Sequence, residues 1–579
     1  MDDFADPRRG EGESVHPPER SGRTRSVREP VFAISLTSSK TLAYRSRADA
    51  DRADDEHEGI PMAGGTIDGF QVHGQDIPWL LRHWAEHRPE HPALVWEPAE
   101  GTGRTWTYAE LLRDTERLAA GLTGRGIGRG AKVLVHSENC PEMVLAWLAC
   151  ATVGAVAVTT NTRATPAEIA YFVERADCVA AVTQPHLAAP LAQSGAALEW
   201  VAVIDGTAPD PLPFADLYDD AATWTGRPIE PLLPFGIMFT SGTTSRPKAV
   251  VHTHANAIWA SRSGPRSIDL GPDDRYLIHL PFFHVNAQSW SFFSVLGAGA
   301  TAVLTPKWST SRFWDVVTRH GITHMSLMPF CFGVLAAPNR PETALRVGVF
   351  GQVAPALDTM LGLRVYAAFG MTETVTHAIT GKPTEHLPAR SMGRPAPGYS
   401  CAVVDPETGR ECAEGEVGEL WLRGQRGVQL FLEYHGDPQA TEAAFVGDWF
   451  RTGDMVLLGA GGNVFYRERD KDLLKVGGEN VSAREVEDVI GAIPGVGSVA
   501  VVGKHHDFLS EVVVAFVIRK PDAPEEGTLE KRILAACRER LSDYKVPRAV
   551  YFVDAFPLGT LDKVLKKSLR ELADARPAL

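Results

Sequence analysis

From about residue 77 onward, the chain repeatedly alternates a strand pattern with a helix pattern. Residues 132–136, 155–159 and 179–182 read as buried strands, and helices are expected over residues 143–153 and 166–175. Strands that alternate with helices form parallel sheets, because a crossover helix brings the chain back to start the next parallel strand. The sequence therefore predicts an α/β protein whose large N-terminal domain has αβα layers around parallel sheet.

Helix boundaries and a change in the sequence pattern divide the chain further. Thr107 and Thr165 are expected to cap helices over residues 108–122 and 166–175, because a threonine side chain can accept from the first free N–H groups. After residue 395, short strands with glycine turns predict a β-rich subdomain. The last part returns to alternating helices and strands, which predicts a small α+β domain.

The predicted organisation therefore has three parts. Residues 1–76 mix acidic and basic side chains and bury little apolar surface, so we expect a largely disordered N-terminal extension. A large ordered part is expected to begin at residue 77 and to pass into the β-rich subdomain near residue 395. The last α+β part follows this subdomain.

Composition limits the classes of partner and compartment. The 579 residues are 44% hydrophobic and 22% charged, a profile of a soluble globular protein, and the net charge of −14 argues against a nucleic-acid partner. The seven cysteines lack metal-ligand or redox spacing, and the first residues lack the apolar stretch of a signal peptide, so a reducing cytoplasmic location is expected. Residues 143–160 carry no charge but are diluted by Ala, Thr and Gly, so no integral membrane association is expected.

The sharpest local signal is a small, hydroxylated loop that follows an apolar strand. It begins Thr240-Ser241-Gly242-Thr243-Thr244 and ends at Lys248. Small residues let backbone N–H groups approach an anion, the hydroxyl groups add donors, and the lysine adds a positive charge. This chemistry is typical of a phosphate cradle, although the glycine spacing is not that of ordinary P-loop NTPases.

This loop resembles the signature of the adenylate-forming superfamily, which contains acyl-CoA synthetases, peptide-synthetase adenylation domains and firefly-type luciferases. The segment around Phe369, Gly370, Thr372 and Glu373 is similar to another motif of that superfamily. The resemblance implies that Phe369 stacks on adenine, that Thr372 contacts phosphate and that Glu373 holds Mg²⁺, a hard ion that prefers oxygen ligands. Two segments look closest to the carnitine-CoA ligase branch.

The resemblance extends to the remaining nucleotide contacts and to the C-terminal part. Gly351 and Gln352 match the turn that passes the adenine, Asp454 the ribose-binding carboxylate, and Arg469 the ribose or phosphate side. The family architecture implies an N-terminal adenylation domain over residues 77–469, with the β-rich subdomain at 395–469. It also implies a mobile C-terminal domain over residues 470–579 that rotates about the hinge residue Lys471. Lys563 matches the lysine that drives adenylation.

The same resemblance implies an acyl pocket and a CoA side. His284 matches a position beside the acyl site and is counted with Lys563, Thr372 and Glu373 as catalytic. The residues expected to line the acyl pocket are Phe283, His284, Gln288, Trp290 and Met328. The residues expected on the CoA side are Lys475, Gly477 and Gly478. Because the pocket segments carry no charge, the acid is expected to be apolar beyond its carboxylate: medium, aromatic or polycyclic.

The predicted activity is that of an AMP-forming acyl-CoA synthetase that uses ATP, Mg²⁺ and CoA with a small carboxylic acid. Two alternatives stay open. One is an adenylating enzyme that passes acyl-AMP to a carrier protein or partner. The other is a member active in only one half-reaction, since Ser245, Ala249, Glu468 and Asp562 depart from the family pattern. Homodimerisation is also left open.

Overall fold

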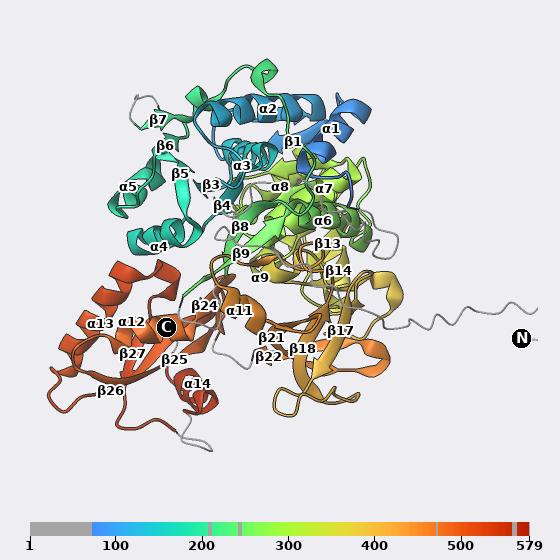
Figure 1. Ribbon diagram of the computed structural model, residues 1–579. Helices are drawn as coiled ribbons and strands as arrows, with labels where there is room; N and C mark the ends of the chain where they lie inside the picture. The colour runs from blue at the N-terminus through green and yellow to red at the C-terminus, as the bar shows by residue number, and fades with distance from the viewer. Residues whose placement is uncertain (1–71, 207–210, 241–245, 470–472, 558–563, 578) are drawn as a thin grey trace, which may run out of the picture. The chain divides into compact units, whose positions relative to one another are not determined.

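The computed structural model describes residues 72–206, 211–240, 246–469, 473–557, 564–577 and 579 (Figure 1). Most of the expected N-terminal extension, up to residue 71, lies outside this part. Regular structure begins with helix α1 (Ile77–His87), whose N-cap Asp76 accepts a hydrogen bond from the backbone of Trp79. Asp76 also pairs with Arg227 at 3.0 Å, so order extends slightly before residue 77.

An eight-stranded sheet has the order β19-β9-β8-β4-β3-β5-β6-β7 and is parallel from β8 to β7. Its strands are β3 (Lys132–His136), β4 (Val156–Thr159), β5 (Cys178–Thr183), β6 (Trp200–Val203), β7 (Leu212–Pro213), β8 (Pro234–Thr240), β9 (Lys248–Thr253) and β19 (Glu433–Tyr434). Helix α2 (Tyr108–Gly124) precedes β3, and the helices between the following strands are α3 (Pro141–Val153), α4 (Pro166–Ala176) and α5 (Pro185–Gln193). Thr107 and Thr165 form capping boxes on α2 and α4, as predicted.

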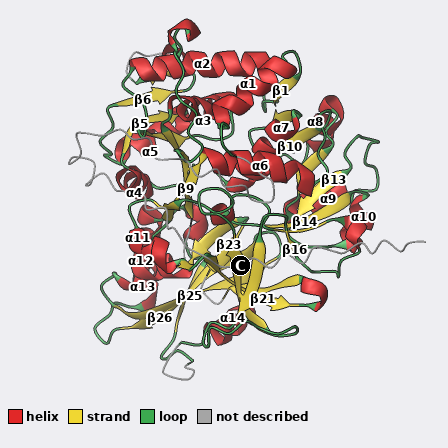
Figure 2. Cartoon of the chain, turned by 45° about the vertical axis from the view of Figure 1, so that its right-hand side comes forward, coloured by secondary structure: helices red, strands yellow, loops and turns green. Residues whose placement is uncertain are grey.

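A nine-stranded sheet has the order β16-β15-β14-β13-β12-β10-β11-β1-β2 and is parallel from β14 to β1. Its strands are β1 (Pro92–Trp96), β2 (Arg104–Thr107), β10 (Arg275–Ile278), β11 (Thr301–Leu304), β12 (His324–Ser326), β13 (Val347–Phe350), β14 (Arg364–Phe369), β15 (Ile379–Gly381) and β16 (Arg394–Pro395). Its helices are α6 (His254–Ser267), the π-helix η4 (Asn286–Phe292), α7 (Phe293–Ala298), α8 (Phe313–His320), α9 (Pro329–Leu335) and α10 (Pro355–Leu361), with α10 packed on β14 (Figure 2).

The main hydrophobic core is centred on Trp147 of α3. Its ring lies 4.9–5.9 Å from four phenylalanine rings, which belong to the first sheet and to the segment around η4. Residues 143–160 thus form a buried helix followed by a buried strand, as predicted. Within the described ranges, no helix is long and apolar enough to cross a bilayer.

The predicted β-rich region forms an antiparallel sheet with the order β17-β18-β21-β20, and β22 also pairs with β21. Its strands are β17 (Ser400–Val404), β18 (Val417–Arg423), β20 (Phe445–Val446), β21 (Trp449–Leu458) and β22 (Val464–Arg469), with helix α11 (Pro438–Ala443) beside β20. Strand β22 begins at Val464, directly after a 3₁₀ turn in which Gly461 has φ +66°.

The C-terminal part forms a fourth sheet with the order β24-β23-β26-β25, and β27 pairs with β26. Its strands are β23 (Leu473–Val476), β24 (Glu479–Ser482), β25 (Val496–His506), β26 (Ser510–Arg519) and β27 (Ala549–Phe552). Its helices are α12 (Ala483–Gly491), α13 (Glu526–Arg540) and α14 (Lys566–Asp574). This α+β arrangement matches the predicted class and has its own apolar core.

Candidate active site

Two residues of the predicted phosphate loop, Thr240 and Lys248, lie opposite each other. They are cross-strand partners in the antiparallel pair β8 and β9 of the eight-stranded sheet. Ser241, Gly242, Thr243 and Thr244 lie outside the described residues. The hydroxyl of Thr240 is buried, and it has no hydrogen-bond partner among the residues that the structure describes. A buried donor beside a lysine is suited to bind an anionic oxygen.

The second group of predicted residues follows two neighbouring strands of the nine-stranded sheet. Gly351 and Gln352 come directly after β13, and Phe369 and Gly370 end β14 and begin the next loop. Because β13 and β14 are parallel, their carboxyl ends lie at one edge of the sheet. Ligands of open α/β sheets bind at this edge.

Tyr434 joins the two sheets and was missed by the sequence analysis. Its hydroxyl donates to Oε1 of Glu373 at 2.9 Å, and Nζ of Lys248 lies 4.5 Å from the centre of its ring. Glu373 is buried in the short helix η5 (Thr372–Thr374), and the preceding carbonyl, that of Thr372, is 2.7 Å from Nε2 of His252. Lys248, Thr372 and Glu373 therefore belong to one connected network.

Asp454 and Arg469 are brought together by the third sheet. They are cross-strand partners in β21 and β22, and the Asp454 side chain is buried. The chain leaves this sheet at Arg469 and enters the C-terminal sheet at Leu473. Lys471 and Lys563 lie outside the described residues, so their predicted roles stay predictions.

The predicted acyl residues lie around η4. Phe283 is a core residue whose ring contacts that of His284, with 4.6 Å between ring centres. The Gln288 amide donates to the Thr159 hydroxyl at 3.0 Å and to the Phe282 carbonyl at 2.8 Å. The two N–H groups of this amide are therefore engaged inside the protein.

The predicted CoA-side glycines form a tight hairpin turn that contacts the acyl residues. Gly477 and Gly478, with φ +61° and +93°, connect β23 to β24, and two consecutive positive φ angles favour glycine. A Cβ atom on Gly478 would lie 3.4 Å from Cε of Met328. The third residue predicted on the CoA side, Lys475, lies against a different side chain: its Nζ is 5.1 Å from the centre of the Tyr466 ring.

The next residue of this hairpin, Glu479, forms an ion pair with His284 at 3.2 Å. Burial lowers the pKa of His284, but the Glu479 carboxylate outweighs this effect, so the pKa is raised overall. Burial in turn raises the pKa of Glu479, and His284 reverses this and holds it below its usual value. The pair was not predicted, because 195 residues separate its members.

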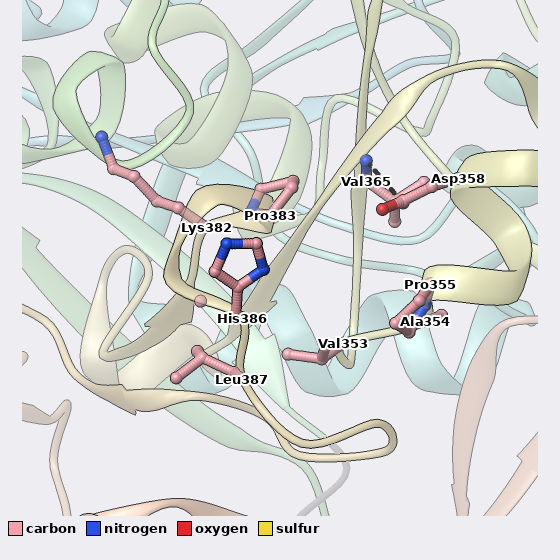
Figure 3. Close-up of a pocket in the computed structure, with 10 residues that line it drawn as sticks. Val353, Ala354, Pro355, Asp358, Val365, Lys382, Pro383, His386 and Leu387 are labelled. Carbon is pink, nitrogen blue, oxygen red and sulfur yellow. Dashed lines mark hydrogen bonds between the residues drawn. The ribbon is translucent and has the colours of Figure 1, made fainter. Parts of the chain in front are cut away.

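A separate cavity of about 230 Å³ lies beside α10 and is lined by ten residues, none of which is a predicted site residue (Figure 3). Asp358 in its wall accepts a hydrogen bond from the backbone of Val365 at 3.0 Å. Lys382 pairs with Asp269 at 2.5 Å, and Figure 3 shows its amine pointing away from the other lining residues. None of the predicted nucleotide or acyl residues lines this cavity, so we do not assign the site to it.

Two family models match the chain: the AMP-binding enzyme model over residues 81–435 and the AMP-binding enzyme C-terminal domain model over residues 485–563. The chain belongs to the AMP-binding enzyme family. A crotonobetaine/carnitine–CoA ligase of Citrobacter koseri is 31% identical over 518 residues, covering 86% of this chain and 99% of that ligase. The predicted adenylate-forming superfamily is thereby confirmed.

Solved structures agree with the fold of this AMP-binding enzyme. The o-succinylbenzoate CoA synthetase of Bacillus subtilis, bound to a product analogue, superposes with a TM-score of 0.73 at 27% identity and covers 86% of this chain and 98% of its own. The same enzyme in complex with ATP and a magnesium ion gives a TM-score of 0.61 at 26% identity, covering 85% and 98%. The predicted fold class is confirmed.

Proposed function

We propose that this chain is an acyl-CoA synthetase that activates a small carboxylic acid in two half-reactions. A carboxylate oxygen attacks the α-phosphorus of ATP, which forms acyl-AMP and releases pyrophosphate. The thiol of CoA then attacks the acyl carbonyl, which forms the thioester and releases AMP. The predicted enzyme class, an AMP-forming acid–thiol ligase using ATP, Mg²⁺ and CoA, is confirmed by the family assignment.

The observation that carries the proposal is the network of Lys248, Tyr434 and Glu373. It links a carboxylate, through Tyr434, to the lysine that lies opposite Thr240, whose buried hydroxyl belongs to the loop expected to bind phosphate. Lys248 and Thr240 suit the phosphate oxygens, and Glu373 suits Mg²⁺, which neutralises phosphate charge when bound. Such preorganised charge stabilises the transition state of phosphoryl and adenylyl transfer.

The remaining roles follow the same assignment. We propose that Phe369, Gly351 and Gln352 contact adenine, that Asp454 and Arg469 hold the ribose, and that Ser241 to Thr244 complete the phosphate loop. Lys563 is proposed to stabilise the charges that meet during adenylation. His284 is proposed to lie beside the acid carboxylate, where Glu479 now pairs with it.

The acid is proposed to be mainly apolar beyond its carboxylate. The segments around Trp290 and Met328 contain no Asp, Glu, Lys or Arg. A charged group on the acid would be buried there without a partner, which costs roughly several kcal/mol. Medium, aromatic or polycyclic acids fit this environment better than amino acids.

We also propose that the enzyme works in two domains that meet at residues 470–472. The chain passes there from β22 of the third sheet to β23 of the fourth. The Gly478 contact with Met328 supports an arrangement in which the Gly477–Gly478 turn faces the acyl site for CoA transfer. Rotation about Lys471 would then present Lys563 for adenylation.

The test measures pyrophosphate release and thioester formation over a panel of carboxylic acids, with and without CoA. We expect acid-dependent pyrophosphate release, CoA-dependent thioester, and loss of the first step alone in Lys563→Ala. Acyl-AMP that accumulates but never reacts with CoA would instead indicate transfer to a carrier protein. Turnover of carnitine or an α-amino acid well above that of apolar acids would overturn the proposed substrate class.

A further inference from the structure

The backbone turns sharply just after the Thr372–Thr374 helix, at Val375. This buried residue has φ +64° and ψ −56°, and the backbone N–H of Thr376 donates to the Thr374 carbonyl at 2.6 Å. These features define a γ-turn of the rare, strained kind, and a β-branched residue at positive φ is a true outlier. Such strain persists where the surrounding structure enforces it, and it clusters at ligand-binding sites.

The turn leads directly into His377, which is buried against Trp290. The centres of the two rings are 4.7 Å apart in an edge-to-face arrangement. Trp290 belongs to the seven-residue π-helix η4, a rare conformation found mainly at functional sites. Two unusual backbone segments therefore meet through these two side chains.

This contact lies next to the proposed acid-activating segment. A Cβ atom on Gly370 would lie 2.4 Å from the Thr376 carbonyl oxygen and 2.9 Å from Cζ2 of Trp290. The backbone at Gly370 thus packs directly on both elements. Gly370 is two residues before Thr372, so the ring pair adjoins the segment proposed to hold phosphate and Mg²⁺.

The polar atoms of the two rings are buried without hydrogen bonds. Within the described part of the chain, neither ring nitrogen of His377 has a hydrogen-bond partner, and Nε1 of Trp290 has none either. His377 is only 1% exposed. More than nine in ten buried polar groups in proteins form a hydrogen bond. Two neighbouring rings whose polar atoms form none therefore indicate a hydrogen-bond partner that is not part of the chain.

Resting on the proposed function, we propose that Trp290 and His377 form a hydrogen-bonding subsite for a neutral oxygen of the acid, such as a hydroxyl or carbonyl group. The Trp290 indole is a donor only, whereas a neutral imidazole offers one donor and one acceptor. Burial lowers the pKa of His377 to about 3, so the ring is neutral at physiological pH. A carbonyl oxygen can accept a hydrogen bond from the indole or the imidazole N–H group, and a hydroxyl can also donate one to the unprotonated imidazole nitrogen. A quaternary ammonium can neither donate nor accept a hydrogen bond.

The experiment compares kcat/KM for pyrophosphate release between matched acids. The probes are benzoic acid with its three monohydroxy isomers, and hexanoic acid with its 3-hydroxy and 5-oxo forms. We expect at least one oxygen-bearing acid to exceed its parent by about tenfold or more, because an unfilled site leaves buried polar groups unpaired.

Three variants and one control separate this role from a structural one. Trp290→Phe and His377→Phe keep a ring but remove the hydrogen-bonding groups, and should reduce the preference to below about threefold. His377→Asn, which keeps a donor and an acceptor, should retain part of it. Trp84→Phe removes another buried indole N–H that also has no partner in the described residues, at a distant position against Gly299, and should leave the preference unchanged.

A second readout is independent of turnover. The ¹⁵N-labelled indole signal of Trp290, assigned by its loss in Trp290→Phe, should shift when the preferred acid binds and not when its parent binds. Equal losses for all acids in the Phe variants would indicate a bound water and overturn the subsite. If every oxygen-bearing acid reacted with the same kcat/KM as its parent acid, the subsite would be overturned and the proposed function would stand. No pyrophosphate release from any acid would refute the proposed function, and the subsite with it.

Discussion

At the scale of the residue, one hydroxyl connects the halves of the proposed phosphate site. Tyr434 donates to Glu373 while its ring faces Lys248. Tyr434→Phe removes the hydroxyl and keeps the ring. A hydrogen bond to a charged group contributes roughly 1.5–3 kcal/mol, so we expect kcat/KM for ATP to fall about 10- to 100-fold. Pyrophosphate exchange measured against Mg²⁺ concentration checks this.

A suitable control is Tyr108→Phe, which removes a buried hydroxyl that donates to the Ala300 carbonyl at 2.7 Å in the core. This variant should lose stability and keep the affinity for ATP. An unchanged exchange rate in Tyr434→Phe would show that Glu373 is oriented by other contacts.

At the scale of the element, helices α6 and α7 approach so closely that only glycine fits between them. A Cβ atom on Gly297 would lie 1.6 Å from the Ser261 carbonyl oxygen. Gly297→Ala should therefore separate the helices that support η4 and destabilise the protein by roughly 3 kcal/mol. Thermal unfolding followed by circular dichroism measures the loss.

The matched control is Gly527→Ala in α13, where an added Cβ meets nothing within 4 Å. It should be neutral or stabilising by up to about 1 kcal/mol, because alanine favours helix. Equal effects of the two substitutions would contradict the packing argument.

At the scale of the whole molecule, a buried lysine joins the C-terminal part to the first sheet's helices. Nζ of Lys545 lies 2.6 Å from Glu168 of α4 and 2.9 Å from Glu485 of α12. Lys545→Met would leave two buried carboxylates unpaired, which typically costs about 3–5 kcal/mol. We expect CoA transfer from preformed acyl-AMP to slow by at least about tenfold, with adenylation less affected.

Lys566→Met is the control, since Lys566 pairs with Glu487 at 2.6 Å inside the C-terminal part. It should not favour one half-reaction over the other. If Lys545→Met slowed both half-reactions equally, the contact would not be specific to the arrangement for CoA transfer.

The His284–Glu479 ion pair also joins the C-terminal part to the rest of the chain, and it makes the stability of the protein depend on pH. Because the pKa of His284 is raised, the pair stabilises the folded state fully when the pH is below 6.5, the usual pKa of histidine. This stabilisation is lost as the pH rises through the raised pKa. The pKa of Glu479 is lowered, so the stabilisation is also lost as pH falls through that value. The difference in Tm between wild type and Glu479→Gln should be largest between these limits and shrink toward pH 9. A constant difference from pH 6 to pH 9 would contradict the charge pairing.

The features that depend on local patterns could be predicted from the amino-acid sequence. The caps at Thr107 and Thr165, the buried strands 132–136 and 155–159, and the α/β class follow from near neighbours in the chain. Local hydrogen bonding and apolar periodicity are fixed within a few residues, so they can be read without the fold.

Which side chains come into contact became visible only in the folded chain. Tyr434 contacts Glu373 from 61 residues away, and Glu479 contacts His284 from 195 residues away, because sheets bring distant strand ends together. The direction of Gln288 into the core and of Trp290 toward His377 depends on a π-helix, whose period differs from the helical period that sequence patterns assume. Long-range pairing and side-chain direction are properties of the packed chain, and no local pattern encodes them.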